Sequence, residues 1–204
     1  MRSQVICQQV TEPMDRTQLS RRSLLALSGA ALFAPQAAGA QQSLAAVRKA
    51  PQWAVTEWIN GDAGNIDTLQ GKVIVIDFFQ LWCPGCNKFS GPLMNHWQKV
   101  FANEIDAGRL VMVKIHTVFE GHTYQTVSRL KEYVKEKGIT LPVGVDAHQD
   151  GQRVPVTMRR YRTSGTPEMA VIDKNGLIRF QQFGGFEYRP VEQLIRALIQ
   201  KTRA

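Results

Sequence analysis

The sequence predicts an α/β fold in which helices flank a central mixed β-sheet. An apolar, β-branched run at 73–79 has the composition of a strand that is buried on both faces. Strand-like and helix-like segments alternate after this run, as they do in βαβ units. An Asn-Gly pair between two later apolar runs then predicts an antiparallel hairpin. Parallel and antiparallel pairing within one chain indicates an α/β sandwich with a mixed sheet.

The first 40 of the 204 residues read as a separate unit. Arg21–Arg22 precede a short apolar run at 24–34, and a small-residue cleavage pattern ends at Ala40. This order is typical of an export signal, and the apolar run is too short to span a bilayer. The arginine pair favours the twin-arginine route, while a general secretory signal and an uncleaved anchor are the alternatives. We therefore expect an export signal at 1–40 and one periplasmic domain at 41–204.

The net charge of +8 is spread along the chain without a run of five or more basic residues. Such a pattern predicts a solvated basic surface and argues against a nucleic-acid partner for an exported protein. It leaves acidic partners and anionic lipid open.

The stretch "LWCPGC" holds Cys83 and Cys86, the two cysteines that remain if Cys7 leaves with the signal. A structural zinc site needs four ligands, and the chain offers no second cysteine pair. Covalent haem attachment needs a histidine where Asn87 stands. A disulfide between the two would close almost the smallest loop there is, so it would constrain the unfolded chain little. A redox pair is the favoured interpretation, with a structural disulfide as the alternative.

The neighbouring residues favour redox chemistry. Pro84 suits the first turn of a helix, which places Cys83 at the helix N-terminus, where free N–H groups and the helix dipole favour a thiolate. Cys86 follows one turn later, close enough to resolve a mixed disulfide. We expect Pro92 to kink this helix.

Asp77 ends a run of buried aliphatic residues, six residues before Cys83. It could be a strand-end aspartate that faces solvent. We favour a buried acid beneath the cysteine pair, where it would relay protons during thiol–disulfide exchange.

The remaining chain supplies the other elements of the sandwich. His116, His122 and His148 are expected to be structural or solvated, because their spacing matches no metal-ligand pattern. In chain order we expect a strand in 109–118, a helix in 124–138, a short strand in 139–146, a short helix in 154–161, a hairpin around 175–176 and a helix at 191–200.

The motifs "IDFFQLWCPGC" and "GTPEMAVIDKNGLIRF", with the closing amphipathic helix, resemble the thioredoxin superfamily and, within it, the exported TlpA/ResA-like thiol:disulfide reductases. The similarity covers about 53–197. It implies a thioredoxin-like sandwich in which Cys83 is the nucleophile, Cys86 the resolving thiol and Asp77 the buried acid. The segment 141–162 corresponds to a region that such exported members insert.

The resemblance also implies a substrate site. Thr166–Pro167 would form a cis-proline loop that faces the cysteines, with Thr166 as a backbone contact to substrate. Trp82 and Pro84, on either side of Cys83, are expected to line the same site. The sequence departs from the family at Pro84–Gly85, which fixes no redox direction, and at Pro92, which lies six residues past Cys86 instead of five.

Together these features predict a periplasmic thiol:disulfide oxidoreductase, a reductase of disulfides in exported proteins, with apocytochromes c as one candidate. We expect no cofactor, no metal and a monomer. The chain has no nucleotide-binding fingerprint with which to take electrons from NADPH, and the family resemblance implies that a membrane thiol-electron transporter re-reduces it. A disulfide oxidase or isomerase is the main alternative. Two less favoured alternatives are a thiol peroxidase and a non-catalytic binding module. A thiol peroxidase would require a threonine at the position of Gln80, and in a binding module the cysteine pair would have no redox function.

Overall fold

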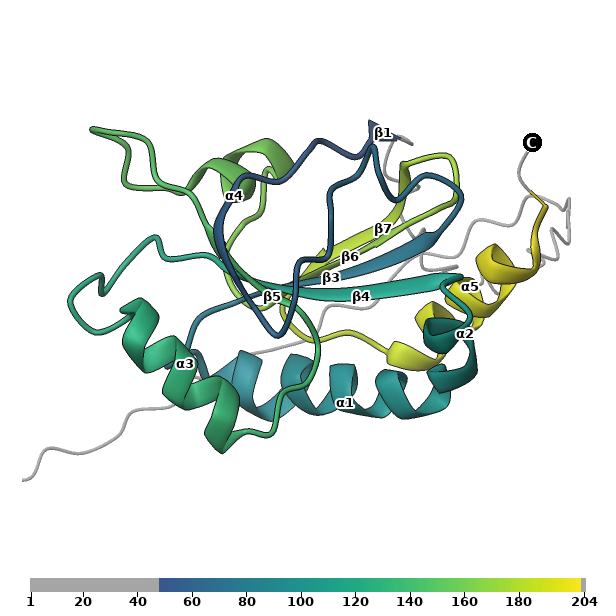
Figure 1. The fold of residues 1–204 in the computed structure, drawn as a ribbon, viewed down its shortest axis with the longest axis horizontal. Coiled ribbons are helices and arrows are strands. Elements are labelled where there is room, and N and C mark those ends of the chain that lie inside the picture. Colours follow the sequence, from purple (N-terminus) through teal and green to yellow (C-terminus); the bar gives the residue numbers. More distant parts are fainter. Residues whose placement is uncertain (1–47, 203–204) are drawn as a thin grey trace, which may run out of the picture. The chain divides into compact units, whose positions relative to one another are not determined.

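A seven-stranded mixed sheet forms the centre of the computed structural model, which describes residues 48–202 (Figure 1). The strands are β1 (Arg48–Lys49), β2 (Val55–Ile59), β3 (Val73–Phe79), β4 (Leu110–His116), β5 (Val143–Asp146), β6 (Glu168–Ile172) and β7 (Leu177–Phe183). The helices are α1 (Gly91–Val100), α2 (Ala102–Asp106), α3 (Val127–Glu136), α4 (Val156–Tyr161) and α5 (Tyr188–Gln200), and a π-helical turn (Cys86–Ser90) precedes α1. The predicted export signal lies outside the described residues.

The sheet has the order β1-β7-β6-β3-β4-β5-β2, with β3 at its centre. Strand β3 pairs in parallel with β4 and antiparallel with β6, and all seven of its residues are buried. The predicted buried strand and the mixed sheet are both confirmed. The predicted hairpin is also confirmed, since β6 and β7 pair antiparallel across a turn in which Gly176 has a φ of 76°.

Alternate residues of β3 serve two separate cores. Val73 and Val75 pack with Trp97 of α1 and Ile195 of α5, whereas Ile74, Ile76 and Phe78 pack with Tyr161 of α4 and with side chains from 50–69. Figure 1 shows α1, α3 and α5 on one side of the sheet and α4 on the other. Since side chains alternate along a strand, Asp77 and Phe79 face the α1 side.

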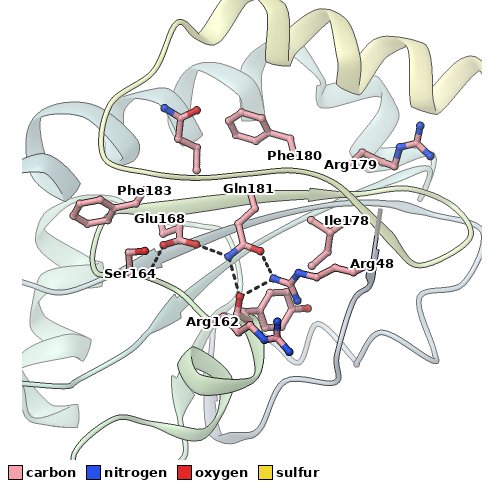
Figure 2. Close-up of a pocket in the computed structure, with 11 residues that line it drawn as sticks. Arg48, Arg162, Ser164, Glu168, Ile178, Arg179, Phe180, Gln181 and Phe183 are labelled. Carbon is pink, nitrogen blue, oxygen red and sulfur yellow. Dashed lines mark hydrogen bonds between the residues drawn. The ribbon is translucent and has the colours of Figure 1, made fainter. Parts of the chain in front are cut away.

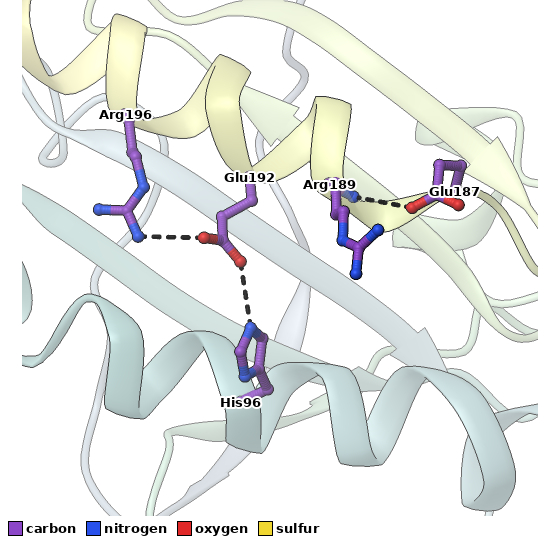
Figure 3. Close-up of polar contacts among 5 residues, drawn as sticks. All are labelled: His96, Glu187, Arg189, Glu192 and Arg196. Atoms are coloured by element: carbon purple, nitrogen blue, oxygen red, sulfur yellow. Dashed lines mark hydrogen bonds and ion pairs between the residues drawn. The ribbon is translucent and has the colours of Figure 1, made fainter.

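A polar contact links α1 to α5. His96 Nε2 lies 3.1 Å from a carboxylate oxygen of Glu192, whose other oxygen accepts a hydrogen bond from Arg196 at 3.0 Å (Figure 3). Burial alone would raise the pKa of Glu192, but these two hydrogen bonds hold it below its usual value. The backbone N–H of Arg189 donates to the Glu187 side chain at 3.4 Å, which caps the start of α5.

The expected disturbance at Pro92 takes the form of a change in helix type. Cys86–Ser90 form a π-helical turn directly before α1, and the Gly91 N–H donates to the Cys86 carbonyl. A π turn accommodates the hydrogen bond that a proline cannot make. The sequence did not predict β1, β2 or α2, which have two to five residues each.

Candidate active site

The two cysteines lie at the start of the helical segment, in the predicted order. Cys83 directly precedes the first helical residue, Pro84, and both thiols are free. The Cys83 thiol donates to the Thr166 carbonyl at 3.2 Å, and the Cys86 N–H donates to Cys83 Sγ, also at 3.2 Å. Cys83 is 8% exposed and Cys86 is 2% exposed. The sulfur that a substrate would reach is therefore Cys83.

The environment of Cys86 keeps its thiol protonated. Burial raises the pKa of Cys86, and its hydrogen bond with Cys83 and the nearby Asp77 charge raise it further. Cys83 Sγ, in contrast, accepts a backbone N–H at the start of a helix. The two sulfurs therefore differ in exposure and in their hydrogen bonds.

A buried ion pair lies beneath the cysteines. Asp77 on β3 and Lys114 on β4 are directly opposite in the parallel register, and the Lys114 ammonium donates to Asp77 Oδ2. The two side chains are 0% and 4% exposed, and Asp77 Oδ1 has no hydrogen-bond partner. The prediction that Asp77 is buried is confirmed, and a solvent-facing strand end is excluded. Sequence reasoning missed Lys114.

A cleft of about 120 Å³ leads from the surface to this ion pair. Cys86, Lys114 and Tyr133 line it, together with Asn95 and Lys137. The pKa of Tyr133 rises to about 12, chiefly through burial, so its hydroxyl stays a neutral donor. The cleft therefore brings Cys86, the Lys114 ammonium and the Tyr133 hydroxyl to one wall.

The proline opposite the cysteines has the predicted geometry. The Thr166–Pro167 peptide bond is cis, and the Thr166 carbonyl faces the Cys83 sulfur. The ring of Pro167 packs against Gly85, where an added Cβ would lie 2.7 Å from Pro167 Cδ. The structure therefore brings the predicted cis-proline loop and the Cys-x-x-Cys turn into contact.

Trp82 extends the site over the surface. Its ring stacks on Tyr124 with the centroids 5.5 Å apart, and the Arg129 guanidinium lies 4.1 Å from the centroid of Tyr124. A Cβ at Gly121 would lie 2.0 Å from Trp82 Cη2, so this glycine is packed against the indole. Trp82 and Tyr124 are each 43% exposed, which leaves an aromatic surface beside Cys83.

Side chains hold the irregular turn that carries the nucleophile. The Asn87 amide donates to the carbonyls of Leu81 and Cys83 at 2.9 and 3.0 Å, and the Tyr133 hydroxyl donates to Asn87 Oδ1 at 3.1 Å. The Leu81 N–H donates to Gln125 Oε1 at 2.9 Å. The backbone before Cys83 is thus held by the π-helical turn, by α3 and by the loop that precedes α3, although it belongs to no regular element.

His116 supports the same turn through Gln125. Gln125 Oε1 accepts the Leu81 N–H, so the contact from His116 Nε2 at 3.0 Å requires a protonated Nε2. His116 Nδ1 is buried without a partner, and burial lowers the pKa of His116 to about 4. This histidine is a neutral structural residue, as the sequence analysis expected.

The other histidines form no metal centre. The rings of His122 and His148 contact each other with centroids 5.2 Å apart, but no three His, Cys, Asp or Glu side chains within 48–202 are grouped as a metal site requires.

Asp146 accepts hydrogen bonds from the Thr157 and Met158 N–H groups at 2.8 and 3.0 Å, and so caps α4.

The sequence and the fold both match known proteins. The family model described as the AhpC/TSA family matches residues 46–181. A solved structure described as thioredoxin-like superfamily protein SPOA0173 is 37% identical, with a TM-score of 0.69, and the match covers 76% of this chain and 99% of that one. A thiol-disulfide isomerase from Corynebacterium glutamicum is also 37% identical, with a TM-score of 0.67 and coverage of 75% and 98%.

Protein DipZ of Mycobacterium tuberculosis is 26% identical over 153 residues, which are 73% of this chain. The chain spans about a fifth of the length of this curated relative, since the match covers 20% of it.

Within 48–202, no helix combines the length and the apolar character that crossing a membrane requires.

Proposed function

This chain belongs to the AhpC/TSA family of thioredoxin-like proteins, and we propose that it is an exported thiol:disulfide reductase that works through Cys83 and Cys86. It is a thiol:disulfide oxidoreductase. The difference between its two sulfurs supports Cys83 as the proposed nucleophile and Cys86 as the proposed resolving thiol. One sulfur is reachable and accepts a backbone N–H, while the other is buried with a raised pKa.

The proposed reaction moves two electrons from the enzyme dithiol to a substrate disulfide. The Cys83 thiolate attacks one substrate sulfur, and the other substrate sulfur leaves as a thiolate that takes up a proton. Cys86 then loses its proton and attacks Cys83 Sγ, which forms the Cys83–Cys86 disulfide and releases the second substrate thiol. The cis-proline loop and the ring of Trp82 are proposed to hold the substrate segment during the first step.

Asp77 is proposed to accept the Cys86 proton. Its charge is close enough to contribute to the raised pKa of Cys86, and its Oδ1 has no other partner. Lys114 would hold the carboxylate in place, and the cleft lined by Lys114 and Tyr133 would pass the proton to solvent. This step completes substrate reduction, and in the reverse direction the same group would return the proton to Cys86.

Location and partners belong to the same proposal. The predicted signal at 1–40 would bring the domain to the periplasm, and a membrane thiol-electron transporter would return the enzyme to the dithiol. Disulfides of exported proteins, including apocytochromes c before haem attachment, are the proposed substrates.

A trapping experiment tests the substrates and the role of Cys83. Cys86→Ser, expressed with the leader, should accumulate mixed disulfides on Cys83, because the resolving thiol is gone. The Cys83→Ser/Cys86→Ser double variant is the matched control and should hold none. Trapped apocytochromes would support a role in haem attachment, and a broad set of exported proteins a general reductant. An empty Cys86→Ser variant would contradict the proposal.

Equilibration of the wild-type pair with glutathione tests the direction. A reductase should have a potential near that of thioredoxin, about −270 mV. A value as oxidising as about −120 mV would instead identify a disulfide oxidase.

A further inference from the structure

A second hollow lies beside the cis-proline loop, along the strand β7. It has a volume of about 280 Å³, and its walls come from β1, the end of α4, the loop before β6 and the strand β7 (Figure 2). Its charged lining residues are Arg48, Arg162, Arg179 and Glu168. The cavity therefore contains more positive than negative groups.

The single lining carboxylate is already engaged. Glu168 accepts hydrogen bonds from the Gln181 amide on one oxygen and from the Ser164 N–H, at 2.7 Å, on the other. Gln181 Oε1 in turn accepts from Arg48 at 2.5 Å. Figure 2 shows this network on the same side of β7 as Arg162. Arg48 supplies the positive charge that acts on Glu168, and no hydrogen bond or ion pair joins Glu168 to Arg162 within the described residues.

Arg162 is the unmatched charge of this cavity. Within 48–202 its exposed side chain makes no hydrogen bond and no ion pair. Its backbone is left-handed, with φ 56° and ψ 40°, and it ends α4. Arg179, in contrast, lies 3.4 Å from Asp173. Arg162 is thus fixed at the wall of the cavity with its guanidinium free to meet an anion.

The cavity lies beside the loop that contacts Cys83. Ser164 and Phe183 are two of its lining residues, and the Phe183 ring packs on Gly165, where a Cβ would lie 2.7 Å from Phe183 Cε2. The next residue, Thr166, contacts Cys83 Sγ through its carbonyl at 3.2 Å. A polypeptide joined to Cys83 through a mixed disulfide can therefore reach the cavity within a few residues.

We propose that this cavity is a substrate subsite in which Arg162 binds the carboxylate of an acidic side chain, two to four residues from the substrate cysteine. Four residues of chain separate Arg162 from Thr166, so their Cα atoms lie at most about 14 Å apart. An extended substrate segment covers that span in about four residues. The proposal rests on the proposed thiol:disulfide activity and adds a preference for acidic substrate segments.

Matched peptide disulfides test the subsite. Three peptides would carry Glu, Gln or Lys three residues from the disulfide-bonded cysteine, and the second-order rate constant for oxidation of the reduced enzyme would be measured. The wild type should react about two- to fivefold faster with the Glu peptide than with the Gln peptide, the range that an accessible ion pair gives. The preference should shrink with added salt.

Variants at Arg162 keep the test specific. Arg162→Asn removes the charge with a residue that tolerates left-handed backbone, and it should abolish the Glu preference while leaving the rate with the Gln peptide unchanged. Arg162→Lys should retain the preference, and Arg162→Glu should shift it to the Lys peptide. Lys99→Gln removes one exposed charge from the far end of α1 and should change nothing.

The outcomes separate the two proposals. Equal wild-type rates with the Glu and Gln peptides, or a preference that survives Arg162→Asn, would overturn the subsite. Loss of the preference in Lys99→Gln would also overturn it, because general charge attraction would then explain the effect. A wild type that reacts with none of the peptides would overturn the proposed function instead.

Discussion

Replacement of Lys114 by methionine should destabilise the fold strongly, because it leaves a buried carboxylate without its counter-charge. The Asp77 side chain is 0% exposed, its Oδ1 has no partner, and Lys114 is the partner of its Oδ2. Removing one member of a buried pair costs about 3–5 kcal/mol, whereas an exposed pair contributes at most about 1 kcal/mol. Full burial of both groups places Lys114→Met in the higher range.

Urea denaturation at pH 7 measures this loss. For a slope of about 2 kcal/mol per molar urea, a loss of 4 kcal/mol lowers the midpoint by about 2 M. Lys131→Met is the matched control, since Lys131 pairs with Glu57 while the two side chains are 54% and 41% exposed. It should change the free energy of unfolding by less than about 1 kcal/mol.

A second charge removal tests the cause. Asp77→Asn/Lys114→Met contains neither charge, so it should be more stable than Lys114→Met alone. The reasoning would be refuted if Lys114→Met cost no more than Lys131→Met, or if the double variant were less stable than the single one.

Three further changes follow from single contacts around the site. Tyr133→Phe removes the hydrogen bond from the Tyr133 hydroxyl to Asn87, so it should lower the free energy of unfolding by about 1 kcal/mol. An unchanged midpoint of urea denaturation would show that this hydrogen bond does not stabilise the fold. Burial lowers the pKa of His116 to about 4, from 6.5 for a free histidine. Between pH 6.5 and pH 4 the unfolded chain therefore binds a proton at this residue that the folded protein does not bind. The free energy of unfolding of the wild type should fall as the pH is lowered through this range. His116→Phe should therefore gain up to about 3 kcal/mol relative to the wild type between pH 7 and pH 4, and parallel stability curves would rule this out. Gly121→Ala should displace the Trp82 ring and change the near-UV circular dichroism, since its Cβ would lie 2.0 Å from Cη2. Gly138→Ala is its control, with a similar φ of 60° and open space around the new Cβ, and equal spectral changes in both would exclude a contact with the indole.

The elements that the sequence predicted correctly are those with a strong local pattern. β3 is apolar except for Asp77, the Asn175–Gly176 turn favours a hairpin, and α5 buries one regular face. β1 and β2 lack such a pattern, because they are short edge strands whose pairing partners lie far along the chain. Their existence depends on the sheet that they join, which local propensity does not describe.

The site shows the same division between local and distant information. A motif of neighbouring residues identified Cys83 and Cys86, and a second motif identified Pro167. The sequence contained one signal for Lys114, which is the single lysine inside the apolar run 110–115. Only the β3–β4 register places it opposite Asp77. The role of Gln125 left no trace, because it binds the active-site turn across 44 residues of sequence.

Gly85 shows how such a distant contact can fix a residue inside a motif. From the sequence alone, no structural reason was apparent for the Pro84–Gly85 pair between the cysteines. In the fold, a Cβ at 85 would lie 2.7 Å from Pro167 Cδ and 3.9 Å from Cys83 Sγ. Any larger side chain would push the cis-proline loop away from the helix start, and with it the Thr166 carbonyl that contacts the Cys83 sulfur. The choice of glycine at this position is therefore a packing requirement set by a loop about 80 residues away, and it keeps the nucleophile and the Thr166 carbonyl within hydrogen-bonding distance.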